Sequence, residues 1–238
     1  MAVLQDQYLD QGLSEAMIYA ENYYRWILER AQPYLGRHIA EVGAGIGSFS
    51  QILAEGPYES LHLIEPNDIL HAALIDRSKD WQNVQLYKQK LSGIQNNSAK
   101  SIDTMIYINV LEHIEDDLCE MQTVYNMLPS GGKVIIFVPA LQFLFAKLDD
   151  MAGHYRRYHR NQLIKLMQAA KFRVLESRYM DSLGIVPYYL MCKVLQQTTL
   201  QETSVKLYDR VAVPVLRHIE KFITPPIGKN IFLVAQRD

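Results

Sequence analysis

The chain has 238 residues, of which 49% are hydrophobic and 21% are charged, and its formal net charge is −2. This composition is typical of a globular protein, and because there is no basic excess it argues against nucleic acid as the partner. The two cysteines, Cys119 and Cys192, have no paired spacing, which argues against a disulfide scaffold and a cysteine-based zinc site.

The first residues do not form a basic region followed by an apolar run, so no signal peptide is predicted and we expect a cytoplasmic protein. The longest apolar stretch, 183–195, is shorter than the roughly 20 residues that span a bilayer. Core packing is its default interpretation, while contact with another subunit or a membrane surface stays open. The oligomeric state is not predicted.

The first 140 residues alternate between helical and extended patterns. A helix is expected to open at Ser14, to carry apolar residues at three- and four-residue steps up to Ala31, and to end by Pro33. Short apolar runs then alternate with helical stretches, which predicts βαβ units and a parallel sheet. The predicted strands are 39–42, 61–64, 84–87, 102–108 and 133–138, and the predicted helices are 48–54, 68–75 and 116–127.

The C-terminal third follows a different pattern. A helix over 161–170 and a strand over 172–177 precede two helical segments, 183–196 and 205–223, of which the second has a kink expected at Pro214. A last strand, 231–235, need not be parallel to the others. We expect one domain over 1–238, with an N-terminal helical lid at 1–36, a cofactor-binding core at 37–140 and insertions at 141–160 and 181–226.

A glycine-rich turn follows the first predicted strand. Gly43, Gly45 and Gly47 let the backbone turn sharply and let a ligand approach the main chain, and the next helix offers its unpaired N–H groups. In a dinucleotide-binding turn the last glycine would stand where this chain has Ser48. The carboxylate of Glu41 also disfavours a pyrophosphate, so the turn suits a cationic ligand or an amino group.

Together with four later segments, this turn resembles the class I S-adenosylmethionine-dependent methyltransferases. Those segments are Glu65 at the end of the second strand, the run 105–114, the Pro-Gly turn and strand 128–138, and the closing run 228–235. The resemblance implies a doubly wound, Rossmann-like α/β fold with seven strands, mostly parallel with an antiparallel last strand, and helical lid insertions. A further segment, 149–158, resembles the D-x-x-x-G-H-x-R-R-Y segment of a bacterial subgroup.

The resemblance also implies S-adenosylmethionine as the cofactor. Glu41 and the glycine turn would hold its methionine portion, and Glu65 its ribose. The adenine contacts stay open, because 88–92 has no acidic residue and Gln89 or a main-chain group would have to replace it. The residues that the resemblance places at the cofactor are Glu41, Gly43, Ala44, Gly45, Gly47, Glu65, Pro66, Asn67, Leu91, Asn109 and Val110.

His113 and His154 are the candidate catalytic bases, since histidine titrates near neutral pH. For His113, a hydrogen bond that only holds the loop is an equal alternative. The candidate acceptor-binding residues are Tyr24, His154, Tyr155 and Arg157, where an arginine would pair with an anionic group of the acceptor or with a neighbouring aspartate.

Four further side chains in this region, Asp149, Asp150, His154 and His159, are of metal-ligand types, but their spacing matches no metal motif. No metal is therefore expected.

The sequence predicts an enzyme that transfers a methyl group from S-adenosylmethionine to a small-molecule acceptor by in-line displacement. The subgroup resemblance suggests a natural product or a glycolipid as the acceptor, by analogy alone. The alternatives are a non-catalytic protein that binds the cofactor and serves a partner, or an NAD-dependent oxidoreductase.

Overall fold

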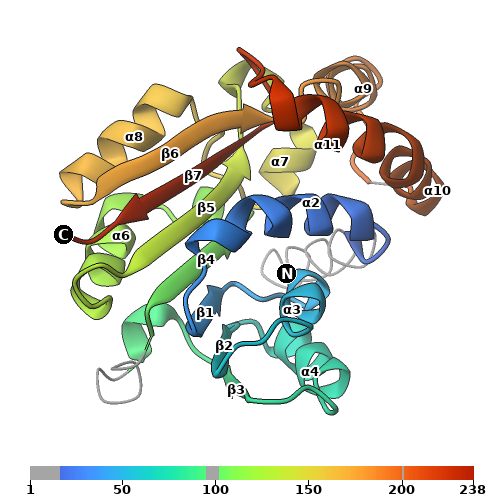
Figure 1. Cartoon of the computed structure of the whole chain (residues 1–238). Coiled ribbons are helices and arrows are strands. Elements are labelled where there is room, and N and C mark those ends of the chain that lie inside the picture. The colour runs from blue at the N-terminus through green and yellow to red at the C-terminus, as the bar shows by residue number, and fades with distance from the viewer. Residues whose placement is uncertain (1–16, 95–101, 200) are drawn as a thin grey trace.

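The computed structural model describes residues 17–94, 102–199 and 201–238. Within these residues, seven strands form one sheet in the order β3-β2-β1-β4-β5-β7-β6 (Figure 1). The strands are β1 (His38–Val42), β2 (Ser60–Ile64), β3 (Val84–Tyr87), β4 (Thr104–Ile108), β5 (Lys133–Pro139), β6 (Arg173–Met180) and β7 (Asn230–Gln236). β7 runs antiparallel to its neighbours β5 and β6, whereas the pairs among β1 to β5 are parallel. The predicted fold class is confirmed.

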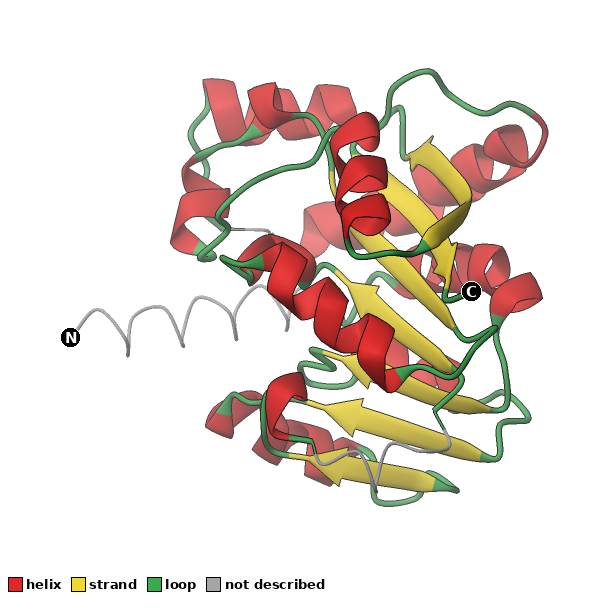
Figure 2. Ribbon diagram, turned by 90° about the vertical axis from the view of Figure 1, so that its left-hand side faces the viewer, coloured by secondary structure: helices red, strands yellow, loops and turns green. Residues whose placement is uncertain are grey.

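Helices cover both faces of the sheet (Figure 2). In the described part of the chain they are α2 (Glu21–Ala31), α3 (Ser48–Leu53), α4 (Asp68–Arg77), α6 (Asp117–Met127), α7 (Lys147–Met151), α8 (Arg160–Ala169), α9 (Ile185–Tyr188), α10 (Glu202–Leu207) and α11 (Val213–Phe222). Buried residues of α6 and α8 pack on one face, and buried residues of α2, α3, α4 and α11 on the other.

The central strands are apolar on both sides because helices cover both faces. All five residues of β4 are buried, as are six of the seven in β5. Phe137 of β5 packs against the ring of Tyr23 in α2, with the ring centroids 5.9 Å apart. Its neighbour Ile136 belongs to the opposite core, which contains Met121 of α6.

The first predicted helix is interrupted in the structure at residues 18–20. Ser14 lies outside the described residues, and α2 begins only at Glu21, after a turn at Ile18 and Tyr19. Among the other elements, β4 begins at Thr104 rather than at residue 102, and β6 continues to Met180 because it pairs with β7 up to that residue. The short helix α7 within 141–160 was not predicted.

Each of the two predicted C-terminal helices contains a π-helical turn. Segment 183–196 consists of α9 and a π-helical turn, Tyr189–Val194. Segment 205–223 continues from α10 through a second π-helical turn, Tyr208–Ala212, into α11. Pro214 lies in the first turn of α11, directly after the π-helical turn, and has no N–H to donate to the turn before it. The proline therefore coincides with a change of helix type, and the kink at Pro214 stays a prediction.

Several apolar side chains of these C-terminal helices are exposed, among them Leu195, Leu207 and Phe222. No helix in the described part of the chain is long and apolar enough to cross a membrane. Contact of these exposed side chains with a membrane surface or another protein stays a prediction.

Asp209, in the second π-helical turn, caps the N-terminus of α2. Its carboxylate accepts hydrogen bonds from the backbone N–H groups of Asn22 and Tyr23 at 3.1 and 2.9 Å. The N-cap residue itself, Ala20, makes no capping hydrogen bond with its side chain. Because the first N–H groups of a helix have no partner within the helix, Asp209 supplies what Ala20 lacks.

Candidate active site

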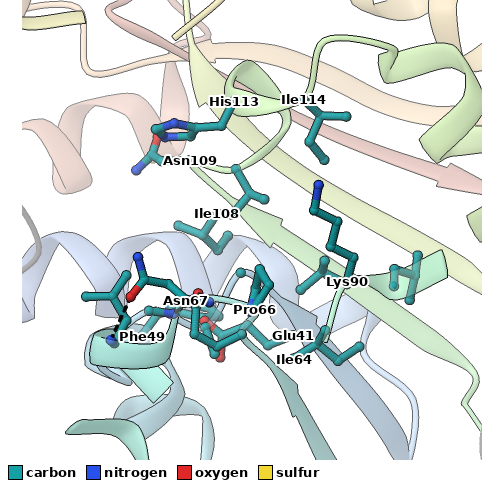
Figure 3. Close-up of a pocket in the computed structure, with 18 of the residues that line it drawn as sticks. Glu41, Phe49, Ile64, Pro66, Asn67, Lys90, Ile108, Asn109, His113 and Ile114 are labelled. Atoms are coloured by element: carbon teal, nitrogen blue, oxygen red, sulfur yellow. Dashed lines mark hydrogen bonds between the residues drawn. The ribbon is translucent and has the colours of Figure 1, made fainter. Parts of the chain in front are cut away.

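A cavity of about 620 Å³ lies at the carboxyl ends of β1, β2 and β4 (Figure 3). Open α/β sheets bind ligands at this edge, and the volume suits a small organic molecule. Figure 3 shows Glu41 and Pro66 on one side of the cavity and Asn109 and His113 on the other.

The glycine turn has a backbone that L side chains rarely adopt. Gly43, Gly45 and Gly47 have φ angles of 72°, 56° and 83°. A Cβ atom on Gly43 would lie 2.4 Å from Cγ2 of Val110, and one on Gly47 would lie 2.8 Å from Cδ1 of Leu74. The first glycine therefore lets the turn pack against the segment after β4, and the third lets α3 pack against α4.

Glu65 connects the end of β2 to the glycine turn. Its carboxylate accepts hydrogen bonds from the backbone N–H of Gly45 and of Asn67, both at 2.8 Å. Asn67 in turn caps α4, because its side-chain oxygen accepts from the N–H groups of Ile69 and Leu70. Glu65, the residue predicted to bind the ribose, thus lines the cavity and also fixes the shape of the turn.

Glu41 lies beneath the turn and is only 3% exposed. Burial raises the pKa of its carboxyl to about 8; the hydroxyl of Ser50, which donates to it at 2.6 Å, opposes this shift, and the nearby Glu65 adds to it. A cationic group in the cavity would favour the ionised carboxylate. The site therefore suits a ligand with an ammonium or sulfonium group.

The segment after β4 forms the opposite wall. Asn109 has a φ of 54°, a region that asparagine tolerates better than most residues, and its N–H donates to the carbonyl of Phe137 at 2.7 Å. The following 3-10 turn, Leu111–His113, brings His113 to the cavity.

His113 and His154 meet at this wall, with ring centroids 4.5 Å apart. Burial lowers the pKa of His113 to about 3, the neighbouring His154 adds to this, and a hydrogen bond with the Ala152 carbonyl opposes it. Nδ1 of His154 lies 2.9 Å from a carboxylate oxygen of Asp149, which fixes the orientation of the ring.

Asp149 is the centre of a buried network. Its carboxylate accepts hydrogen bonds from Arg157 and from the hydroxyl of Tyr188, at 2.9 and 2.7 Å, besides its contact with His154. Burial alone would raise the pKa of Asp149, but hydrogen bonds and the charge of Arg157 lower it to about 2. Asp149 therefore stays ionised, and Arg157, which is 5% exposed, is held away from the cavity.

Glu112 lies behind the two histidines and is fully buried. Neither carboxylate oxygen has a hydrogen-bond partner among the described residues. Burial raises the pKa of Glu112 to about 7, against the opposing charge of His154.

The cavity brings together most of the residues that the sequence singled out. Two of them do not line it: Gly47 packs against Leu74 and Trp81, and Arg157 pairs with Asp149. The interpretation of Arg157 as an acceptor ligand does not match this position, and the alternative, pairing with an aspartate, does. The predicted residues that line the cavity are Tyr24, Glu41, Gly43, Ala44, Gly45, Glu65, Pro66, Asn67, Leu91, Asn109, Val110, His113, His154 and Tyr155.

Sequence reasoning missed several lining residues, including Met17, Phe49, Lys90 and Glu120. Lys90 follows β3, where the adenine contacts were left open, and Gln89 is not among the lining residues. Phe49 could have been predicted to line the cavity, because it lies at the start of α3, directly after the glycine turn that is expected to bind the cofactor. No local sequence pattern around Met17 or Glu120 predicts that they line the cavity.

A family model described as "Methyltransferase domain" matches residues 19–177, which is more than half of the chain. The chain belongs to this family. Membership confirms the predicted class of enzyme, a methyltransferase, and its cofactor, S-adenosylmethionine. The match identifies neither the acceptor nor the bacterial subgroup. No curated protein matches the chain.

Solved structures share the fold at low sequence identity. Phosphoethanolamine N-methyltransferase 2 of Haemonchus contortus, in complex with S-adenosyl-L-methionine, is 16% identical with a TM-score of 0.62, over 91% of this chain and 52% of that protein. The chain thus spans about half of that relative. A methyltransferase of Thermotoga maritima, described as a possible histamine N-methyltransferase, is 14% identical with a TM-score of 0.64 over the whole of both chains.

A third similar structure is the putative methyltransferase of Haloferax volcanii in complex with the activator Trm112. It is 11% identical with a TM-score of 0.65, over 98% of this chain and 97% of that one. At these identities the likeness shows the fold alone.

Proposed function

We propose that this methyltransferase methylates a hydroxyl or amine of a small-molecule acceptor that lies against His113 and His154. One observation carries the proposal. A single cavity joins the buried Glu41 and the glycine turn on one side to the oriented His154–Asp149 pair on the other. A cofactor and a nucleophile can therefore meet in one cavity, as methyl transfer requires.

The residues on the Glu41 side fit the cofactor. Glu41 would face its amino group, the main chain of the glycine turn would pass close to its methionine portion, and Glu65 would take its ribose hydroxyls. When bound, S-adenosylmethionine supplies a methyl group that its sulfonium already activates. The protein therefore has to bind, orient and exclude water, and the buried aromatic ring of Tyr24 closes the cavity on the α2 side.

On the other side, His154 is the better candidate for the general base. Its Nδ1 contacts the ionised Asp149, so Nε2 is left to accept a proton from an acceptor hydroxyl or ammonium. His113 is a weak base because burial lowers its pKa to about 3. Tyr155, which is 53% exposed at the cavity mouth, would contact the acceptor. A natural product or a glycolipid remains the proposed acceptor class.

Calorimetric titration tests the cofactor side, with S-adenosylmethionine, S-adenosylhomocysteine and, as a control, NADH. We expect saturable binding of the first two and none of NADH. Replacing Glu65 with alanine (Glu65→Ala) removes the acceptor of the Gly45 and Asn67 N–H groups and should weaken binding by about 10- to 100-fold, or roughly 1.4–2.8 kcal/mol. Asp68→Ala, at an exposed position three residues along the chain, should bind as wild type does.

Unchanged affinity in Glu65→Ala would remove Glu65 from the site. Binding of NADH alone would revive the oxidoreductase alternative. Binding of S-adenosylmethionine without methylation of any acceptor in a panel of hydroxyl and amine compounds would favour the non-catalytic alternative.

A further inference from the structure

Three possible metal ligands meet at the acceptor side of the cavity, although the sequence predicted no metal there. Glu112, His113 and His154 each offer one ligand atom, and the three atoms all lie within 4.8 Å of one another. Glu112 and His113 are adjacent in the 3-10 turn after β4, and His154 follows α7. Of the candidates considered from the sequence, only His154 belongs to this group, and Asp149, Asp150 and His159 join no such group among the described residues.

The burial of the Glu112 carboxylate calls for a physical explanation. It is 0% exposed, and neither oxygen has a hydrogen-bond partner among the described residues. Buried polar groups in folded proteins are nearly always paired, because an unpaired buried carboxylate is costly. A cation held between Glu112 and the two histidines would give this carboxylate a partner through the oxygen that lies near the two rings.

One of the two histidines also has the outer contact that metal-binding histidines usually have. Nδ1 of His154 contacts the carboxylate of Asp149 at 2.9 Å. A carboxylate on one ring nitrogen fixes the ring and leaves the other nitrogen for the ion.

We propose that Glu112, His113 and His154 bind a divalent transition-metal ion, such as Zn²⁺ or Co²⁺, whose open coordination position faces the cavity. Two imidazoles and one carboxylate favour such ions over Mg²⁺ or Ca²⁺, which prefer oxygen ligands alone. Three protein ligands with a fourth position open are typical of catalytic rather than structural sites. Both histidines line the cavity, so that position is reachable by an acceptor.

This inference rests on the proposed function for the position of the acceptor in the cavity. It narrows the proposed acceptor class to molecules with a hydroxyl group. The ion would bind that oxygen and lower its pKa, so that the O–H bond breaks, the proton passes to water and the electron pair stays on oxygen. With the ion bound, His154 is a ligand, and the ion replaces it in activating the acceptor.

Metal uptake can be measured without any acceptor. Protein freed of metal by a chelator and dialysed would be titrated with Co²⁺, followed by its visible absorption, and with Zn²⁺ by calorimetry. We expect one equivalent of each ion to bind. Glu112→Gln should weaken binding by at least about tenfold, because it removes the anionic ligand at nearly constant shape. His159→Ala, which removes an exposed histidine five residues from His154, should bind as wild type does.

Thermal unfolding of the same proteins guards against a misfolded variant. Glu112→Gln removes an unpaired buried carboxyl, so its melting temperature without metal should equal or exceed that of wild type. Zn²⁺ should raise the melting temperature of wild type and of His159→Ala but leave that of Glu112→Gln unchanged.

Absence of saturable uptake by folded wild type, or equal uptake by Glu112→Gln, would overturn the metal site. Titration with S-adenosylmethionine on the same samples separates the two proposals. Cofactor binding without metal uptake contradicts only the metal site, whereas metal uptake without cofactor binding contradicts only the proposed function.

Discussion

At the scale of single residues, the buried acidic groups beside the cavity make stability depend on pH. Burial raises the pKa of Glu41 to about 8 in the folded protein, well above the usual range of a glutamate side chain. The folded state therefore binds this proton more tightly than the unfolded state does. The stability that this provides is fully present below about pH 4.5 and is lost as the pH rises through 8.

We predict that Glu41→Gln flattens this part of the pH profile. The free energy of unfolding of the variant minus that of wild type should increase between pH 5 and 8, by at most about 1.4 kcal/mol per pH unit for one proton. Urea unfolding at several pH values measures it, with Glu55→Gln, an exposed change, as the control. A difference that does not vary with pH would mean that Glu41 is ionised throughout.

At the scale of elements, the glycine turn and the segment after β4 depend on each other. Gly43 and Gly153 have nearly the same φ angle, 72° and 75°. A Cβ on Gly43 would lie 2.4 Å from Val110, whereas one on Gly153 would meet nothing within 4 Å. Alanine substitutions at these two glycines therefore separate the cost of a positive φ from the cost of steric overlap with Val110.

We expect Gly153→Ala to cost about 1–2 kcal/mol of stability, the strain of a left-handed alanine. Gly43→Ala should cost a further 1–3 kcal/mol or so, from overlap with a stiff β-branched side chain, and should weaken cofactor binding. Adding Val110→Ala to Gly43→Ala should recover part of that excess. Chemical denaturation of the four proteins measures it, and equal losses in the two glycine variants would show that the Val110 contact relaxes freely.

The same elements show what the sequence could predict. The strands, the turn and Glu65 follow from patterns within a few residues, because alternation, glycines and strand ends are local features. The group formed by Glu112, His113 and His154 could not be predicted, because it joins segments some forty residues apart whose approach depends on packing. The sequence left two interpretations of Arg157 open, and its pairing with Asp149 becomes visible only in the buried network of the folded chain.

At the scale of the whole molecule, Asp209 joins the C-terminal helices to α2. Asp209→Ala should expose the unpaired N–H groups of Asn22 and Tyr23 and cost about 1–2 kcal/mol of stability. Because Tyr24 of α2 lines the cavity, cofactor affinity should fall as well. Denaturation and calorimetry measure the two effects, with Asp76→Ala, an exposed aspartate on α4, as the control. Loss of stability with unchanged affinity would show that α2 does not help to hold the cofactor.

The position of β7 also affects how the chain folds during its synthesis. It is the last strand along the chain, yet it lies between β5 and β6, and β6 has no other partner in the described sheet. During synthesis, strands β1 to β5 can pair before residues 230–236 leave the ribosome. β6 has no strand to pair with until β7 has been made. Unpaired strand edges favour aggregation, so a chain that stalls or is cut before Asn230 should be a substrate for chaperones and proteases rather than a smaller working enzyme.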